Sequence, residues 1–71
     1  MAATDGNIEH RFTYHPPNDE KVLKHEVIRG KGLTLAIIIS ELCPPSFERD
    51  EALKKVDEAV MWANASIARN E

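Results

Sequence analysis

The sequence predicts an all-α fold, an antiparallel hairpin of two helices with an N-terminal aromatic arm or short helix, assembled into a compact homo-oligomer. Two long segments, residues 19–42 and 47–70, carry apolar residues at the spacings of three and four that place side chains on one helix face. The stretch CPPS between them holds a proline pair that cannot continue the first helix. A connection this short makes the two helices antiparallel neighbours.

The first helix is expected over residues 19–42, with Asn18 or Asp19 as its N-cap. Gly30 and Gly32 argue against a helix, because each costs about 1 kcal/mol relative to alanine. The run LTLAIIIS is also rich in strand formers. A strand would need a partner, and the sequence has no second run of this kind, so the length of the segment favours a helix. Its apolar stripe consists of Val27, Ile28, Leu35, Ile38, Ile39 and Leu42.

Residues 43–46 are the expected turn, and Ser46 is the candidate N-cap of a second helix over residues 47–70. The seam of this helix steps by three and four and consists of Leu53, Val56, Val60, Ala63 and Ile67. A second stripe of small residues runs beside it at intervals of seven and consists of Ala52, Ala59 and Ser66. A helix with two adjacent stripes packs against two neighbours, so the second stripe predicts a contact with another subunit.

The N-terminal part precedes both helices. Residues 1–9 are small and polar, and we expect a frayed end. Residues 10–18 read HRFTYHPPN, an arm that carries Phe12 and Tyr14. The proline pair at residues 16 and 17 of this arm favours extended backbone and a stiff bend before the first helix.

Composition excludes several classes of protein. The net charge is −3, with 9 basic and 12 acidic residues, so we expect no DNA or RNA partner. The start of the chain resembles no signal peptide, and the longest apolar run, LAIII, is too short for a membrane span. A single cysteine, Cys43, forms no intrachain disulfide and fits a cytosolic setting. With 71 residues and neither a disulfide nor a metal cluster, the hairpin is left with self-association as its source of extra stability.

Two groups of side chains are candidates for ligand binding. Tyr14 could stack on a nucleobase, a contact worth about 1–3 kcal/mol, or it could pack with Phe12 as a lid over the hairpin. Arg29 and Lys31, in the stretch IRGKG, could hold phosphate or belong to a solvated basic face.

The sequence shows no catalytic constellation. Nothing fixes His10, His15 and His25 in one cluster, and Cys43 has no positioned base nearby. We therefore expect a protein that is not an enzyme and holds neither a cofactor nor a metal.

Three blocks, RFTYHPP, IRGKG with ISELCPPS, and EALKKVDEAVMWANASIARNE, resemble a known family. They are similar to the helical-hairpin domain of phage-encoded cyclic-nucleotide sponges, the anti-CBASS and anti-Thoeris proteins. The resemblance covers residues 10–71, and without room for a β-rich portion the chain is more similar to the compact anti-CBASS type. It implies a hexamer that traps cyclic dinucleotides such as cyclic GMP-AMP, and in some members cyclic trinucleotides, without cleaving them. CBASS-type antiphage signalling would thereby be blocked in the cytoplasm of the infected bacterial host.

The resemblance also implies roles for individual residues. Tyr14 matches a tyrosine that stacks on a base, and Lys31 is the candidate for a phosphate-binding lysine on the first long helix, with Arg29 as its rival. Arg69 is the candidate for a separate trinucleotide pocket. Two neighbours of Tyr14 in the arm, Phe12 and His15, are also candidate ligand-binding residues. The alternatives are a sponge for the cyclic ADP-ribose signals of Thoeris defence and a small helical protein-interaction module.

Overall fold

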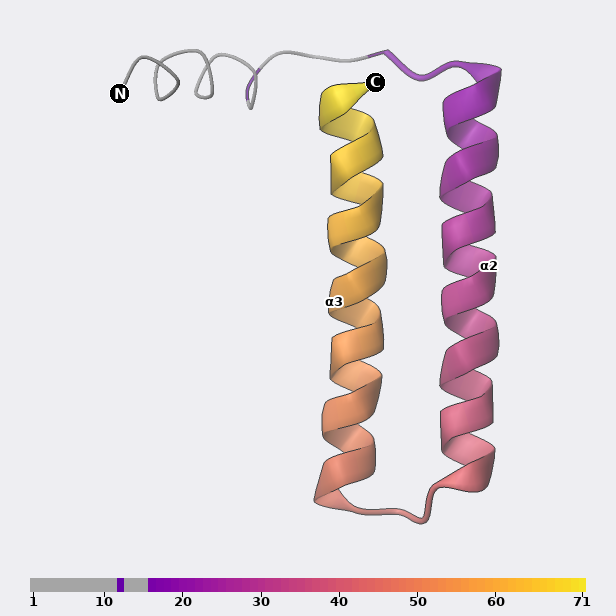
Figure 1. The fold of residues 1–71 in the computed structure, drawn as a ribbon, viewed down its shortest axis with the longest axis vertical. Helices are drawn as coiled ribbons and strands as arrows, with labels where there is room; N and C mark the ends of the chain where they lie inside the picture. The colour runs from indigo at the N-terminus through magenta and orange to yellow at the C-terminus, as the bar shows by residue number, and fades with distance from the viewer. Residues whose placement is uncertain (1–11, 13–15) are drawn as a thin grey trace.

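The computed structural model describes Phe12 and residues 16–71 (Figure 1). Helix α2 spans Asp19–Leu42 and helix α3 spans Phe47–Asn70, each of 24 residues. The two helices lie side by side and antiparallel, so the C-terminus lies beside the start of α2 (Figure 1). The predicted all-α hairpin is confirmed, and the strand-forming run LTLAIIIS is helical. The predicted frayed end and most of the predicted arm lie outside the described residues.

Side-chain hydrogen bonds mark the start of each helix and the end of α2. The Oδ1 atom of Asn18 accepts a hydrogen bond of 2.8 Å from the backbone N–H of Lys21 and so caps α2. The Oγ atom of Ser46 accepts one of 3.1 Å from the backbone N–H of Arg49 and caps α3 in the same way. The guanidinium of Arg49 also donates to the carbonyl oxygens of Ser40 and Cys43, at 3.3 and 3.4 Å. It therefore satisfies carbonyls that the end of α2 leaves unpaired.

The two helices pack closely at Gly32. A Cβ atom at this position would overlap the side chain of Val60, whereas one at Gly30 would meet nothing within 4 Å. The seam predicted for α3 is half-buried or buried along its whole length. The stripe predicted for α2 is partly wrong, because the structure exposes four of its members: Val27, Leu35, Ile38 and Leu42. The half-buried positions of α2 instead include His25, Ile28, Gly32, Ala36 and Ile39.

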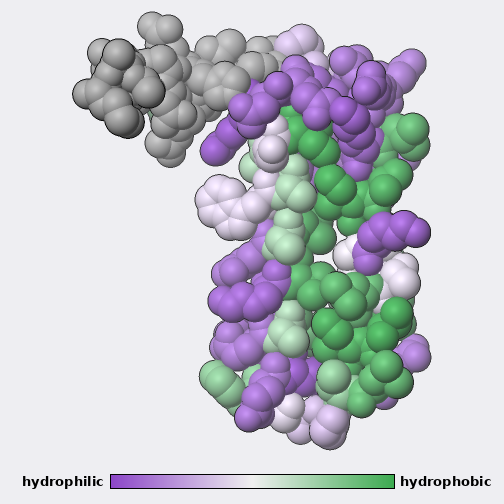
Figure 2. Space-filling view, viewed as in Figure 1, coloured by the Kyte–Doolittle hydropathy of each residue, from purple (hydrophilic) through white to green (hydrophobic). Residues whose placement is uncertain are grey.

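The hairpin leaves much of α2 uncovered. Among the described residues Ile67, at 8% exposure, is the one buried hydrophobic side chain. Large apolar side chains are exposed on α2 at eight positions, namely Val22, Leu23, Val27, Leu33, Leu35, Ile37, Ile38 and Leu42. Figure 2 shows the resulting hydrophobic surface running along the α2 side of the molecule. A helix that is apolar around most of its circumference is normally buried. One neighbouring helix, α3, therefore covers only part of the apolar surface of α2.

Candidate functional site

Two open grooves flank the contact between Gly32 and Val60, one on each side of the hairpin. The first, here called the Lys31 groove, has a volume of about 480 Å³ and is lined by Ile28, Lys31, Gly32, Leu35, Lys55, Val56, Ala59, Val60 and Ala63. The second, the Arg29 groove, has a volume of about 410 Å³ and is lined by Arg29, Gly32, Leu33, Ala36, Val56, Asp57 and Val60. The two grooves share Gly32, Val56 and Val60 as a common wall.

Helical geometry explains why the two candidate phosphate ligands lie in different grooves. Arg29 and Lys31 are two positions apart in α2, which at 3.6 residues per turn is about 200° around the helix. Gly32 faces α3, so the two basic side chains leave the helix on either side of it. Within one hairpin they cannot line the same groove.

The charges that line the two grooves also differ. In the Lys31 groove the charged lining residues are Lys31 from α2 and Lys55 from α3, and all the other lining residues are apolar. In the Arg29 groove the charged lining residues are Arg29 and Asp57, which have opposite signs. An anionic ligand is therefore attracted by both charges of the Lys31 groove, whereas Asp57 repels it in the Arg29 groove.

The three candidate cations, Arg29, Lys31 and Arg69, are available for a ligand. Their side chains form no ion pair and no hydrogen bond with any of the described residues. The other described basic residues have partners, which are carboxylates for Lys24, Lys54 and Lys55 and backbone carbonyls for Lys21 and Arg49. An unpaired cation is free to bind phosphate without first giving up a carboxylate.

The structure does not bring all the predicted site residues together. Arg69 lies in the last turn of α3, is exposed and lines neither groove. Phe12 is 83% exposed. Tyr14 and His15 lie outside the described residues.

Sequence reasoning missed the two charged lining residues that α3 supplies, Lys55 and Asp57. Both flank Val56, a member of the predicted seam of α3, and this adjacency was the available signal.

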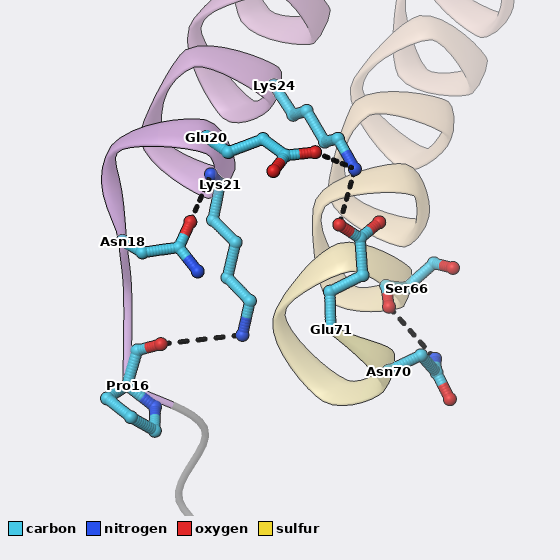
Figure 3. A network of polar contacts seen from close by, with 8 residues as sticks. All are labelled: Pro16, Asn18, Glu20, Lys21, Lys24, Ser66, Asn70 and Glu71. Carbon is cyan, nitrogen blue, oxygen red and sulfur yellow. Dashed lines mark hydrogen bonds and ion pairs between the residues drawn. The ribbon is translucent and has the colours of Figure 1, made fainter.

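A polar cluster joins the two helices at their open end (Figure 3). The ammonium of Lys24 contacts Glu20 at 3.4 Å and Glu71, the residue after α3, at 2.5 Å. The hydrogen bond to Glu71 raises the pKa of Lys24 above its usual 10.5, because it favours the charged form. Lys21 is buried, and its Nζ atom donates to the carbonyl of Pro16 at 3.4 Å. This contact ties the segment before α2 to the helix.

A second polar contact between the two helices joins His25 of α2 to Asn64 of α3. The Nδ1 atom of His25 lies 2.8 Å from the Oδ1 atom of Asn64 in a partly buried position. Since the amide oxygen only accepts, His25 is the donor. The described residues hold no group of three His, Cys, Asp or Glu side chains that would suit a metal ion. None of the helices in the described part of the chain is long and apolar enough to cross a membrane.

These features define a small helical-hairpin protein whose two grooves are lined by cations, with two lysines around one apolar groove. A family model described as "Acb2/Tad1, hairpin domain" matches residues 4–68. The chain therefore belongs to this family of anti-CBASS and anti-Thoeris sponges, phage proteins that sequester cyclic-nucleotide signals. No curated protein and no solved structure gave a match. The family resemblance predicted from the sequence blocks is confirmed.

Proposed function

We propose that this protein binds cyclic oligonucleotide second messengers, chiefly cyclic dinucleotides, and sequesters them without cleavage. By lowering the free signal it would block CBASS-type defence in the cytoplasm of the infected host. Family membership supports the class of ligand. The observation that carries the proposal is Lys31, whose side chain has no partner among the described residues and lies at the edge of an apolar groove that none of those residues lines with a carboxylate.

The groove suits the chemistry of a cyclic dinucleotide. Such a ligand has two phosphates and two base faces, which require cations and apolar or aromatic contact area respectively. The aliphatic walls of the Lys31 groove supply contact area for a base. Tyr14, in the arm, remains our candidate for stacking on a base, with Phe12 and His15 beside it.

Calorimetry with a panel of cyclic dinucleotides, cyclic trinucleotides and cyclic ADP-ribose tests the proposal. We expect at least one cyclic dinucleotide to bind with a Kd below about 1 µM, which is about −8 kcal/mol. The ligand should be recovered intact after the protein is denatured. Tight binding of cyclic ADP-ribose alone would instead assign the chain to Thoeris signals, and the absence of any binding would refute the sponge function.

Two matched variants distinguish the candidate phosphate ligands. Lys31→Ala should weaken dinucleotide binding at least about tenfold, because a charge-assisted hydrogen bond contributes about 1.5–3 kcal/mol. Arg29→Ala removes a cation from the opposite side of the hairpin and should change the affinity much less. The reverse order of effects would move the phosphate site to the Arg29 groove.

Arg69 supports a separate site for trinucleotides, because its side chain has no partner in the described part of the chain and lies away from both grooves. Arg69→Ala should weaken cyclic trinucleotide binding and leave dinucleotide binding unchanged. Equal losses for both ligands would contradict a separate pocket.

The exposed apolar surface of α2 supports assembly into a homo-oligomer, which we propose is a hexamer. Two side chains near the middle of that surface, Leu33 and Ile37, are 63% and 47% exposed. Ile37→Lys should lower the molar mass measured by light scattering, because it places a charge in the proposed interface. A wild-type chain that is monomeric and binds no nucleotide would instead favour a protein-interaction module.

A further inference from the structure

We infer that Lys55 of α3 is a second phosphate-binding residue, which acts across the Lys31 groove from Lys31. This inference rests on the proposed function and extends it, because it adds a residue from the other helix to the ligand site. It also specifies the ligand as one with two separated negative charges.

The geometry of the groove provides the first argument. Lys31 and Lys55 line the same groove but come from α2 and α3 respectively, and Ala59 and Ala63 lie with Lys55 on the α3 wall. Alanine side chains are short, so they leave open space on that wall. The long aliphatic stem of a lysine can lie along such a wall while its ammonium reaches the ligand.

The second argument is electrostatic. Lys31 and Lys55 carry like charges around an apolar groove, so they repel each other when the groove is empty. A ligand with two phosphates neutralises both, whereas a ligand with one phosphate neutralises one. The groove therefore favours a dianion, and this preference requires Lys55 as well as Lys31.

The present partner of Lys55 does not prevent this role. Its Nζ atom lies 3.6 Å from Glu58, and the two side chains are 69% and 55% exposed. Exposed pairs of this kind contribute little to stability, and Glu58 does not line the groove. Lys55 can therefore exchange Glu58 for a phosphate at small cost.

The chain supplies a closely matched control in Lys54. This neighbour is also 69% exposed and is paired with Glu51 at 3.5 Å, but it does not line the groove. Replacing Lys54 or Lys55 by methionine keeps the aliphatic stem and removes one charge. Both variants therefore lose one positive charge, but only the residue replaced in Lys55→Met lines the groove.

The test is calorimetry of the full chain with cyclic GMP-AMP, a dianion, and with cyclic GMP, a monoanion. Lys55→Met should weaken cyclic GMP-AMP binding at least about tenfold, Lys54→Met should change it less than about twofold, and Lys55→Arg should keep most of the affinity. The ratio of cyclic GMP-AMP to cyclic GMP affinity should fall in Lys55→Met. Light scattering should give the same molar mass for all variants.

The outcomes separate this inference from the proposed function. If the wild type binds cyclic GMP-AMP and Lys55→Met binds it as tightly as Lys54→Met does, the role of Lys55 is refuted and the sponge function stands. If Lys55→Met changes the molar mass, the groove is a contact between copies of the chain and the inference fails. If the wild type binds neither probe, both this inference and a dinucleotide function at this groove fail.

Discussion

The two glycines of α2 allow a paired test of how closely the helices pack. Gly30→Ala should raise the free energy of unfolding by about 1 kcal/mol, because alanine is the better helix former and its Cβ meets open space. Gly32→Ala has the same gain in propensity, but its Cβ overlaps Val60. Overpacking of this kind costs about 1–3 kcal/mol, so the variant should be neutral or destabilised by up to about 2 kcal/mol.

The assay is thermal unfolding followed by circular dichroism, at one protein concentration because assembly makes the Tm depend on concentration. A difference of about 1–3 kcal/mol between the two variants is readily measured, since each 1 kcal/mol shifts the Tm of a domain this small by about 4–8 °C. Val60→Ala should partly rescue Gly32→Ala, because it removes the Cγ2 methyl group that the new Cβ would overlap. The reasoning is refuted if Gly32→Ala is as stable as Gly30→Ala.

Three further predictions concern the polar contacts. His25→Leu or Asn64→Leu alone should lower the unfolding free energy by about 1 kcal/mol, because the partner loses its hydrogen bond. The double variant should lose less than the sum of the two single losses. Additive losses would show that the contact contributes nothing. The raised pKa of Lys24 means that its stabilising contribution is fully present below its ordinary pKa of 10.5 and is lost as the pH rises through the raised value. The Tm of Lys24→Met should therefore fall less than that of the wild type between about pH 9 and about pH 12, and parallel curves would contradict this. Arg49→Met should cost about 1 kcal/mol in denaturant unfolding, because two carbonyls at the end of α2 lose a donor, and an unchanged midpoint would argue that water replaces it.

Much of the fold follows from local sequence signals. The proline pair at Pro44 and the cap at Ser46 separate two segments that are each long enough to be a helix. The face of α2 that meets α3 was harder to predict, because apolar residues occur around most of its circumference. The position of α2 that packs against Val60 is a glycine, Gly32. A pattern built from large apolar side chains does not include a glycine, so it does not identify this contact.

The candidate site was only partly predictable for a related reason. Helical periodicity separates Arg29 from Lys31, but which of them shares a groove with a carboxylate depends on how α3 is rotated and shifted against α2. Lys55 and Asp57 enter the grooves through that tertiary relation, which local sequence does not encode. Tyr14 was a stacking candidate from its residue type, the family resemblance strengthened that role and added His15, and the contribution of both remains a prediction.

The wall formed by Gly32, Val56 and Val60 separates the two grooves and is only one layer of side chains thick. A change that widens one groove by moving this wall narrows the other. An occupant that displaced this wall from one side would change the affinity of the opposite side, and an occupant of the opposite side would then change the affinity of the first side by the same factor. Sequence variation at these three positions would tune both faces together, so relatives that change one ligand preference should also change what packs behind it.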